Sequence, residues 1–193
     1  MQIDLHKPIL DKNDSLAADL RKQFAEKHVY VVDLLASPGS GKTSTILATI
    51  DALRDEFNIA VIEGDIASSV DAEKIKAQGI PAVQINTGGA CHLESAMLKR
   101  AIDVLDLDRL DLIIVENVGN LVCPTDFDLG ENAKVMILAF SPRSKSVGHT
   151  RLPTFSMMIK SRRSRSRTSM ARLSMALSRW HAPPVLICTA GIP

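Results

Sequence analysis

The chain has 193 residues, 46% of them hydrophobic and 23% charged, which is enough to bury the core of one domain. It holds no run of eighteen apolar residues and no basic-then-apolar leader, so we expect a cytoplasmic protein with no membrane partner. The formal net charge is +1, but the charges are unevenly distributed along the chain. Residues 1–131 carry all 22 acidic residues and 12 Lys and Arg. Residues 132–193 carry 11 Lys and Arg and no acidic residue.

Helical and strand patterns alternate from the N-terminus to about residue 139. A first helix with the stripe Leu16, Leu20 and Phe24 is predicted to begin at a cap among residues 13–15. Apolar runs predict strands over residues 29–32, 59–62, 82–85, 112–115 and 135–138, and helical spacing predicts helices over residues 46–53 and 93–104. This alternation predicts an α/β fold with a doubly wound, mostly parallel sheet flanked by helices, and ligands gathered at the carboxyl ends of the strands.

Residues 36–43 read Ala-Ser-Pro-Gly-Ser-Gly-Lys-Thr between a predicted strand and a predicted helix, which is the context of a phosphate-binding loop. Its glycines let several backbone N–H groups point at a phosphate, and the helix N-terminus adds positive partial charge. The motif predicts a P-loop NTPase. Its phosphate-binding residues are Ser37, Pro38, Gly39, Ser40, Gly41, Lys42, Thr43 and Ser44.

Two carboxylates follow predicted strands and suit Mg²⁺, which prefers hard oxygen ligands. Asp65 follows the second strand, and Glu116 ends the fourth, three residues before Gly119, whose N–H is placed to sense a γ-phosphate. Asp71 is a weaker candidate. The alternative is that these acidic residues merely begin loops.

The adjacent pair Cys91 and His92, together with the distant Cys123, forms a candidate site for Ni²⁺ or Zn²⁺. Three ligands leave a four-coordinate site incomplete, so either a water or substrate completes it or two subunits combine their sets. The alternative is that the cysteines are buried and inert, as we expect for Cys188 within its apolar run.

Six segments together resemble the HypB-type hydrogenase nickel-incorporation GTPases, over about residues 10–139. They are Ser37-Pro-Gly-Ser-Gly-Lys-Thr43, Glu63-Gly-Asp65, Asp71-Ala-Glu73, Gly79-Ile-Pro81, Ile85-Asn-Thr-Gly-Gly-Ala-Cys-His-Leu93 and Glu116-Asn-Val-Gly-Asn-Leu-Val-Cys-Pro124. The resemblance implies a SIMIBI-like G domain that hydrolyses GTP and helps deliver nickel to the large subunit of a nickel–iron hydrogenase.

The same resemblance implies a role for each matching position. Lys42, Asp65 and Glu116 would be catalytic, with Thr43, Asp65 and Glu116 serving Mg²⁺ and the switches. Cys91, His92 and Cys123 would hold Ni²⁺ or Zn²⁺ where the two subunits of a nucleotide-dependent homodimer meet. A small HypA-type protein and the hydrogenase large subunit are the implied partners.

Two departures from the family pattern matter. No N-terminal Cys-x-x-Cys motif or His-rich stretch occurs, so a metal-storage role has no support. No Asn-Lys-x-Asp motif follows the strand at residues 135–138, so an acidic group that reads guanine is missing. We therefore divide the chain into a P-loop GTPase domain, residues 1–140, and a basic Ser/Arg-rich segment, residues 141–193, that is disordered or translated out of frame.

Two other functions fit parts of the sequence. The Arg-Ser run at residues 161–167 favours a tail that binds nucleic acid or an acidic partner, although only Phe155 and Trp180 are available there for base stacking. A small-molecule kinase would use the phosphate-binding loop but would leave Cys91, His92 and Cys123 without a role. We therefore expect the metallochaperone function, with nucleic acid not among the partners.

Overall fold

One sheet runs through the computed structural model, which describes residues 6–65, 75–140, 154–161 and 186–189. Its strand order is β3-β2-β4-β1-β5-β6-β7. The strands are β1 (Tyr30–Ala36), β2 (Ile59–Asp65), β3 (Ala82–Asn86), β4 (Leu112–Glu116), β5 (Ala133–Phe140), β6 (Thr154–Ser161) and β7 (Leu186–Thr189). The helices are α1 (His6–Glu26), α2 (Lys42–Leu53) and α4 (Ser95–Ile102), with single 3₁₀ turns at Leu107–Arg109 and Cys123–Thr125.

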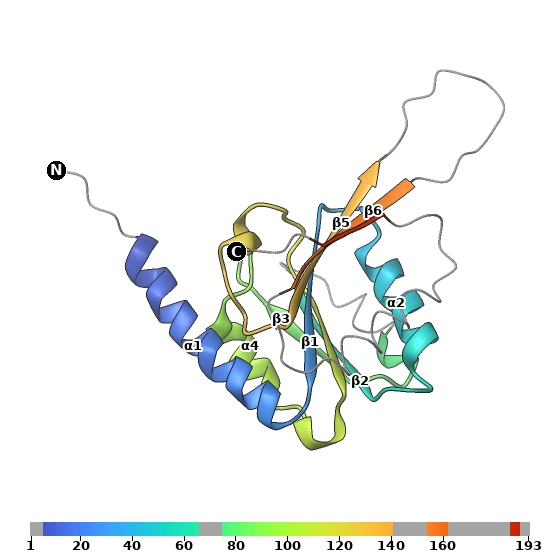
Figure 1. Ribbon diagram of the computed structural model, residues 1–193, viewed down its shortest axis with the longest axis horizontal. Coiled ribbons are helices and arrows are strands. Elements are labelled where there is room, and N and C mark those ends of the chain that lie inside the picture. The colour runs from blue at the N-terminus through green and yellow to red at the C-terminus, as the bar shows by residue number, and fades with distance from the viewer. Residues whose placement is uncertain (1–5, 66–74, 141–153, 162–185, 190–193) are drawn as a thin grey trace.

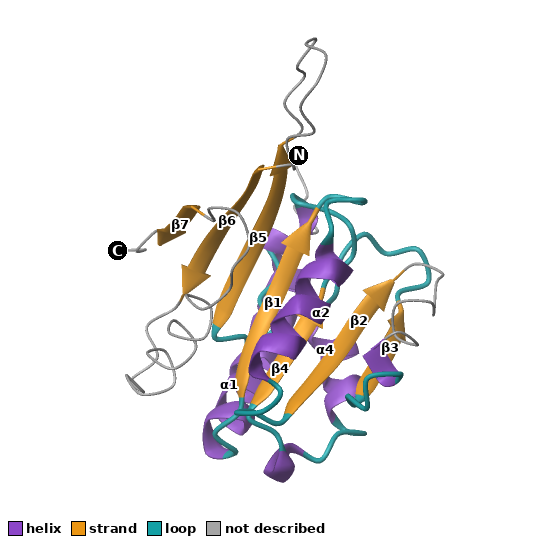
Figure 2. Ribbon diagram, turned by 90° about the vertical axis from the view of Figure 1, so that its right-hand side faces the viewer, coloured by secondary structure: helices purple, strands orange, loops and turns teal. Residues whose placement is uncertain are grey.

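Strands β1 to β5 are all parallel to one another, as the sequence predicts for a doubly wound α/β fold. Strand β1 lies between β4 and β5, although β2 and β3 follow it in sequence, so the chain reverses its direction of winding beside β1. The carboxyl ends of these parallel strands meet at one edge of the sheet (Figure 2). That edge is where a ligand site is expected in this class of fold.

Helices cover both faces of the sheet and define two cores. Helix α2 packs Ile46 and Ile50 on one face, in the same buried cluster as Val61 of β2 and Ile114 of β4. Helices α1 and α4 cover the opposite face (Figure 1). There Ile113 of β4 belongs to the core. Because neighbouring residues of β4 enter opposite cores, its sequence is a continuous apolar run, as the buried strands of a parallel sheet require.

Two details of the sequence prediction are wrong. Helix α1 begins at His6 rather than after a cap at residues 13–15, and Asn13 lies inside it. The Asn13 side chain instead accepts a hydrogen bond from the Ser95 backbone N–H (2.9 Å) and donates one to the Asp128 carbonyl (2.7 Å), which ties α1 to α4. The helix predicted over residues 93–104 is also too long. Val104, predicted to lie on its apolar stripe, lies beyond the end of α4 and is 71% exposed.

Two strands fall within the segment for which the sequence predicts irregular backbone. Strand β6 pairs antiparallel with β5, and β7 pairs parallel with β6. Backbone pairing at an open sheet edge requires N–H and C=O groups rather than a particular side chain, which is why composition did not indicate it. Residues 141–153, 162–185 and 190–193, including the Arg-Ser run, lie outside the described residues. The division of the chain at residue 140 stays a prediction.

No helix in the described part of the chain is long and apolar enough to cross a membrane.

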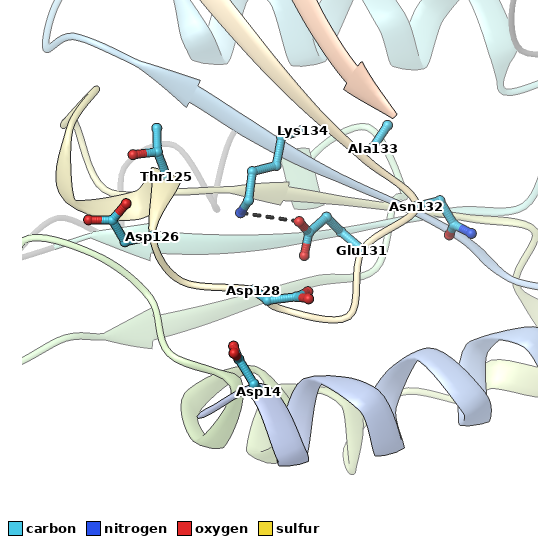
Figure 3. Close-up of a pocket in the computed structure, with 8 residues that line it drawn as sticks. All are labelled: Asp14, Thr125, Asp126, Asp128, Glu131, Asn132, Ala133 and Lys134. Atoms are coloured by element: carbon cyan, nitrogen blue, oxygen red, sulfur yellow. Dashed lines mark ion pairs between the residues drawn. The ribbon is translucent and has the colours of Figure 1, made fainter. Parts of the chain in front are cut away.

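A buried ionic cluster joins β1 to β5. Asp33 on β1 is fully buried, and its carboxylate lies 2.7 Å from the ammonium of Lys134 on β5. The same ammonium lies 3.2 Å from a carboxylate oxygen of Glu131, beside a cavity of about 150 Å³ with an acidic lining (Figure 3). One cation therefore serves two buried carboxylates.

The carboxyl group of Glu131, the second of the cluster, keeps its proton to a higher pH than an ordinary glutamate. Burial raises the pKa of Glu131 to about 7, the Lys134 charge opposes this rise, and the negative charges of Asp33 and Asp128 add to it. The pKa of Lys134 is itself raised, since the two adjacent carboxylates outweigh the cost of burying its charge. Lys134 thus stays charged at neutral pH, while Glu131 exchanges a proton there.

This cluster predicts that the folded state loses stability as the pH rises. Glu131 has an ordinary pKa of 4.5 when unfolded and about 7 when folded, so between these values the folded chain holds a proton that the unfolded chain has lost. The free energy of unfolding should fall by up to about 3 kcal/mol across that window. Glu131→Gln should remove this contribution. Urea unfolding at pH 5 and pH 8 measures the effect, and an equal stability difference between the two proteins at both pH values would contradict it.

Candidate functional site

The phosphate-binding loop joins β1 to α2 as the sequence predicts. Gly39 and Gly41 adopt φ values of +72° and +87°, which L side chains rarely adopt, so both positions need glycine. The Ser40 hydroxyl donates a hydrogen bond to the Ser37 carbonyl (2.6 Å) and closes the turn. Lys42 and Thr43 then begin α2, a helix of 12 residues, so the loop faces the positive end of its dipole. Ser44 follows in the first turn and is exposed.

Acidic side chains lie beside the first turn of α2. The Thr43 hydroxyl donates a 3.5 Å hydrogen bond to the carboxylate of Glu116, which is 8% exposed at the end of β4. Glu63 of β2 is in register with Glu116 and is 3% exposed. Both residues lie on the α2 face of the sheet, because Val61 and Ile114, two positions earlier in each strand, belong to the core under α2. Oxygen ligands are therefore concentrated near the phosphate-binding loop.

For the other two predicted acidic residues, the structure gives the backbone position of Asp65 only. Asp65 is the last residue of β2, in register with Asn86 of β3, at the same edge of the sheet. Asp71 lies outside the described residues. Glu63 was not among the predicted candidates, and its signal in the sequence was its position in Glu-Gly-Asp, on the same face of the strand as Asp65 by the two-residue period.

Gly119 lies directly against the phosphate-binding loop. A Cβ atom added at Gly119 would lie 3.0 Å from the Cγ of Pro38, closer than nearly all real Cβ contacts. Glycine is therefore needed here for close approach rather than for an unusual backbone conformation. The segment after β4 is in contact with the loop that precedes α2.

The two cysteines of the candidate metal site are adjacent although 32 positions apart in the sequence. A hydrogen bond with the Cys123 thiol raises the pKa of Cys91, the Cys123 charge raises it further, and a hydrogen bond from the Asn120 side chain lowers it. Both thiols are free, and Cys91 is exposed. The loop after β4, which holds Asn120 and Cys123, therefore meets the loop before α4.

His92 is close to this pair but is held by other groups. Its Nδ1 lies 3.6 Å from the Cys91 sulfur, while its ring stacks on Phe127 with the ring centroids 3.8 Å apart. Its Nε2 lies 3.7 Å from a carboxylate oxygen of Glu94. Within the residues that the structure describes, no group of three or more His, Cys, Asp or Glu is arranged to hold a metal ion. The predicted set of Cys91, His92 and Cys123 stays a prediction.

Three residues that the sequence analysis did not select contact these loops. Asn117 is 1% exposed and hydrogen-bonds to the backbone of Leu93 and to Asp33. The sequence feature that could have indicated Asn117 is its position directly after Glu116. Asn120 bonds to Cys91, and Phe127 stacks on His92. Neither of these has a local signal, since each contact depends on how two separate loops come together.

We predict that Lys42→Ala loses affinity for nucleoside triphosphate by at least about tenfold, because charge-assisted hydrogen bonds to a phosphate contribute about 1.5–3 kcal/mol each. Isothermal titration calorimetry measures the affinity. Lys99→Ala, which removes an exposed lysine on α4, is the matched control and should bind normally. Unchanged binding by the Lys42 variant would refute the phosphate-site assignment.

We also predict that Cys91→Ala and Cys123→Ala each lower affinity for Ni²⁺ and Zn²⁺ while nucleotide binding survives, since the two thiols are neighbours and neither lies in the phosphate-binding loop. Equilibrium dialysis followed by metal analysis gives the affinity. Cys188→Ala is the control, because Cys188 lies in β7 at the other end of the sheet order. Equal metal content in all four proteins would rule the site out.

Comparison with known proteins points to one family. The profile described as "CobW/HypB/UreG, nucleotide-binding domain" matches residues 30–138. The chain is 47% identical over 137 residues to "Hydrogenase maturation factor HypB" of Rhizobium leguminosarum bv. viciae, an alignment that covers 71% of this chain and 46% of the relative. It is 48% identical over 131 residues to the protein of the same name from Escherichia coli (strain K12), covering 68% of this chain and 45% of that one.

A solved structure gives the same result in three dimensions. The crystal structure of HypB from Helicobacter pylori in complex with nickel matches with a TM-score of 0.62 and 41% identity, over 66% of this chain and 60% of that chain. The present chain thus spans about half the length of the curated relatives it matches.

Proposed function

This chain belongs to the HypB family of hydrogenase maturation factors, and we propose from that membership and from its site that it is a GTP-hydrolysing metallochaperone for nickel insertion into a nickel–iron hydrogenase. The observation that carries the proposal is the meeting of two sets of groups at one edge of the sheet. The hydroxyl of Thr43 in the phosphate-binding loop bonds to Glu116, and the chain that leaves Glu116 contacts that loop at Gly119 and continues to Cys123, beside Cys91.

The groups at the start of α2 suit a triphosphate with Mg²⁺. The backbone of Gly39 to Gly41 and the Lys42 ammonium would bind the phosphates, as a helix N-terminus and a lysine do in P-loop proteins. Thr43, Asp65 and Glu116 would serve the Mg²⁺, and Glu63 adds a further carboxylate beside Glu116. When bound, Mg²⁺ would offset the negative charge on the transferred phosphoryl group.

Nickel would be the cargo, held at Cys91, His92 and Cys123. The exposure of Cys91 favours an exchangeable ion over a structural one, because a structural site is closed by four ligands. Two subunits that dimerise with nucleotide would bring two such sets together. A HypA-type protein and the hydrogenase large subunit would be the partners in metal transfer.

Hydrolysis and metal release together test this proposal. With Mg²⁺ present, the wild-type chain should hydrolyse triphosphate, and nickel bound beforehand should be released at a rate that depends on the nucleotide. Lys42→Ala should abolish both effects, and Cys123→Ala should abolish nickel binding but keep hydrolysis. A chain that hydrolyses no triphosphate, or that binds nickel no better than the Cys91→Ala variant, would refute the proposal.

We predict that this chain discriminates GTP from ATP by less than about tenfold, or 1.4 kcal/mol. The reason is that its sequence has no Asn-Lys-x-Asp motif and no acidic residue after Glu131 to accept hydrogen bonds from guanine. Competition between the two nucleotides in the hydrolysis assay measures the ratio. Stronger discrimination would show that guanine is read elsewhere. If another reading frame beyond codon 140 encodes Asn-Lys-x-Asp, the protein translated in that frame should prefer GTP strongly.

A further inference from the structure

Leu93 follows the Cys91–His92 pair and contacts both strands that carry carboxylates toward the nucleotide site. Its backbone N–H donates a hydrogen bond to the side-chain oxygen of Asn117 at 3.1 Å. Its side chain is fully buried and packs against Gly64. One residue next to the candidate metal ligands is therefore held by two distant segments.

Asn117 gives this backbone contact a fixed position. It directly follows Glu116 and is 1% exposed. Its side-chain oxygen also accepts a hydrogen bond from Val118 N–H (3.0 Å), and its amide donates one to the buried carboxylate of Asp33 (3.0 Å). Since these three bonds are made by one buried side chain, Asn117 cannot turn without losing them. A displacement of the segment after β4 must therefore move the Leu93 amide or break its bond.

Gly64 likewise fixes the position of the Leu93 side chain. It lies in β2 between Glu63 and Asp65. A Cβ atom added at Gly64 would lie 2.8 Å from the Cγ and both Cδ atoms of Leu93, so the buried Leu93 side chain would have to shift. The φ of Gly64 is not positive, so close approach of Leu93 is what requires glycine here. The end of β2 and the Leu93 side chain are thus closely packed.

We propose that Leu93 is a positioning residue that couples nucleotide state to metal affinity, with Asn117 and Gly64 as its two contacts. Each contact lies one position from a carboxylate of the nucleotide side, Asn117 from Glu116 and Gly64 from both Glu63 and Asp65. A nucleotide that shifts either strand end alters the position of Leu93, and with it the adjoining Cys91–His92 pair. Because coupling between two binding sites is reciprocal, bound metal alters nucleotide affinity by the same factor. This inference rests on the proposed function.

The test measures the nickel affinity of the full chain with and without Mg²⁺ and a non-hydrolysable imido analogue of GTP. The ratio of the two affinities is the coupling factor, on the order of 5–150 for coupled sites. In Leu93→Ala and Gly64→Ala the factor should fall toward 1 while each ligand alone still binds. Leu98→Ala is the matched control, because Leu98 is fully buried in the same core but makes neither contact, so it should lose stability and keep the factor.

A double variant separates stability from coupling. Gly64→Ala overpacks the contact, and Leu93→Ala vacates the space that the new methyl group needs. The double variant should therefore have a higher urea midpoint than Gly64→Ala alone, yet its coupling factor should stay near 1. A wild-type coupling factor in both single variants would overturn the proposal.

A measurement on the unaltered protein covers the case in which a variant fails to fold. Adding Mg²⁺ and the imido analogue, with no nickel present, should change the hydrogen-exchange protection of the Leu93 amide, since its bond to Asn117 is the link under test. The Ile102 amide, in the interior of the same core, is the reference and should keep its protection. An unchanged Leu93 amide would overturn the proposal.

The outcomes also separate this inference from the proposed function. A wild-type chain that hydrolyses triphosphate and binds nickel, but with a coupling factor of 1, refutes the coupling and leaves the proposed function standing. A chain that neither hydrolyses triphosphate nor binds nickel refutes both.

Discussion

The buried carboxylate of Asp33 is the constraint on which the arrangement of the sheet and its loops depends. It is fully buried in β1, and its two oxygens are satisfied by Lys134 of β5 and by the amide of Asn117 after β4. An unpaired charge at this depth would cost several kcal/mol, so the carboxylate, the ammonium and the amide must meet. The contact therefore joins β5 and the start of the loop after β4 to β1.

That arrangement explains why the phosphate-binding loop and the candidate metal residues lie at one edge of the sheet. Strand β1 delivers the phosphate-binding loop, β4 delivers Glu116, and the loop after β4 runs past Pro38 to Cys123. Each group is at the end of a parallel strand, and the ends of parallel strands coincide. Only seven positions of the chain separate Glu116 from Cys123.

Similarity to other HypB proteins covers this edge and stops near residue 138. The matched residues 30–138 include the phosphate-binding loop, the strands that carry Glu63 and Glu116, and the three candidate metal ligands. The missing guanine-reading motif falls where the similarity ends. The phosphate-binding loop and the candidate metal residues thus lie within the matched part of the chain, and no Asn-Lys-x-Asp motif follows it.

The sequence by itself determined the parts of this protein that depend on local rules. The glycines of residues 36–43, the apolar strand runs and Glu116 at a strand end were predictable, because loop conformation and burial period are set by neighbouring residues. The boundaries of α1 were not, since Asn13 is satisfied by Ser95, 82 positions away. Whether a polar residue caps a helix or joins two helices depends on partners that local sequence does not reveal.

Only the tertiary structure decided how the candidate site is connected. The stack of His92 on Phe127, the bond from Leu93 to Asn117 and the fit of Leu93 against Gly64 each join segments that folding alone brings together. The sequence supplied glycine, leucine and asparagine at these positions without saying which pairs meet. The physical reason is that close packing and buried hydrogen bonds are properties of contact geometry, which exists only once the strands have been ordered in the sheet.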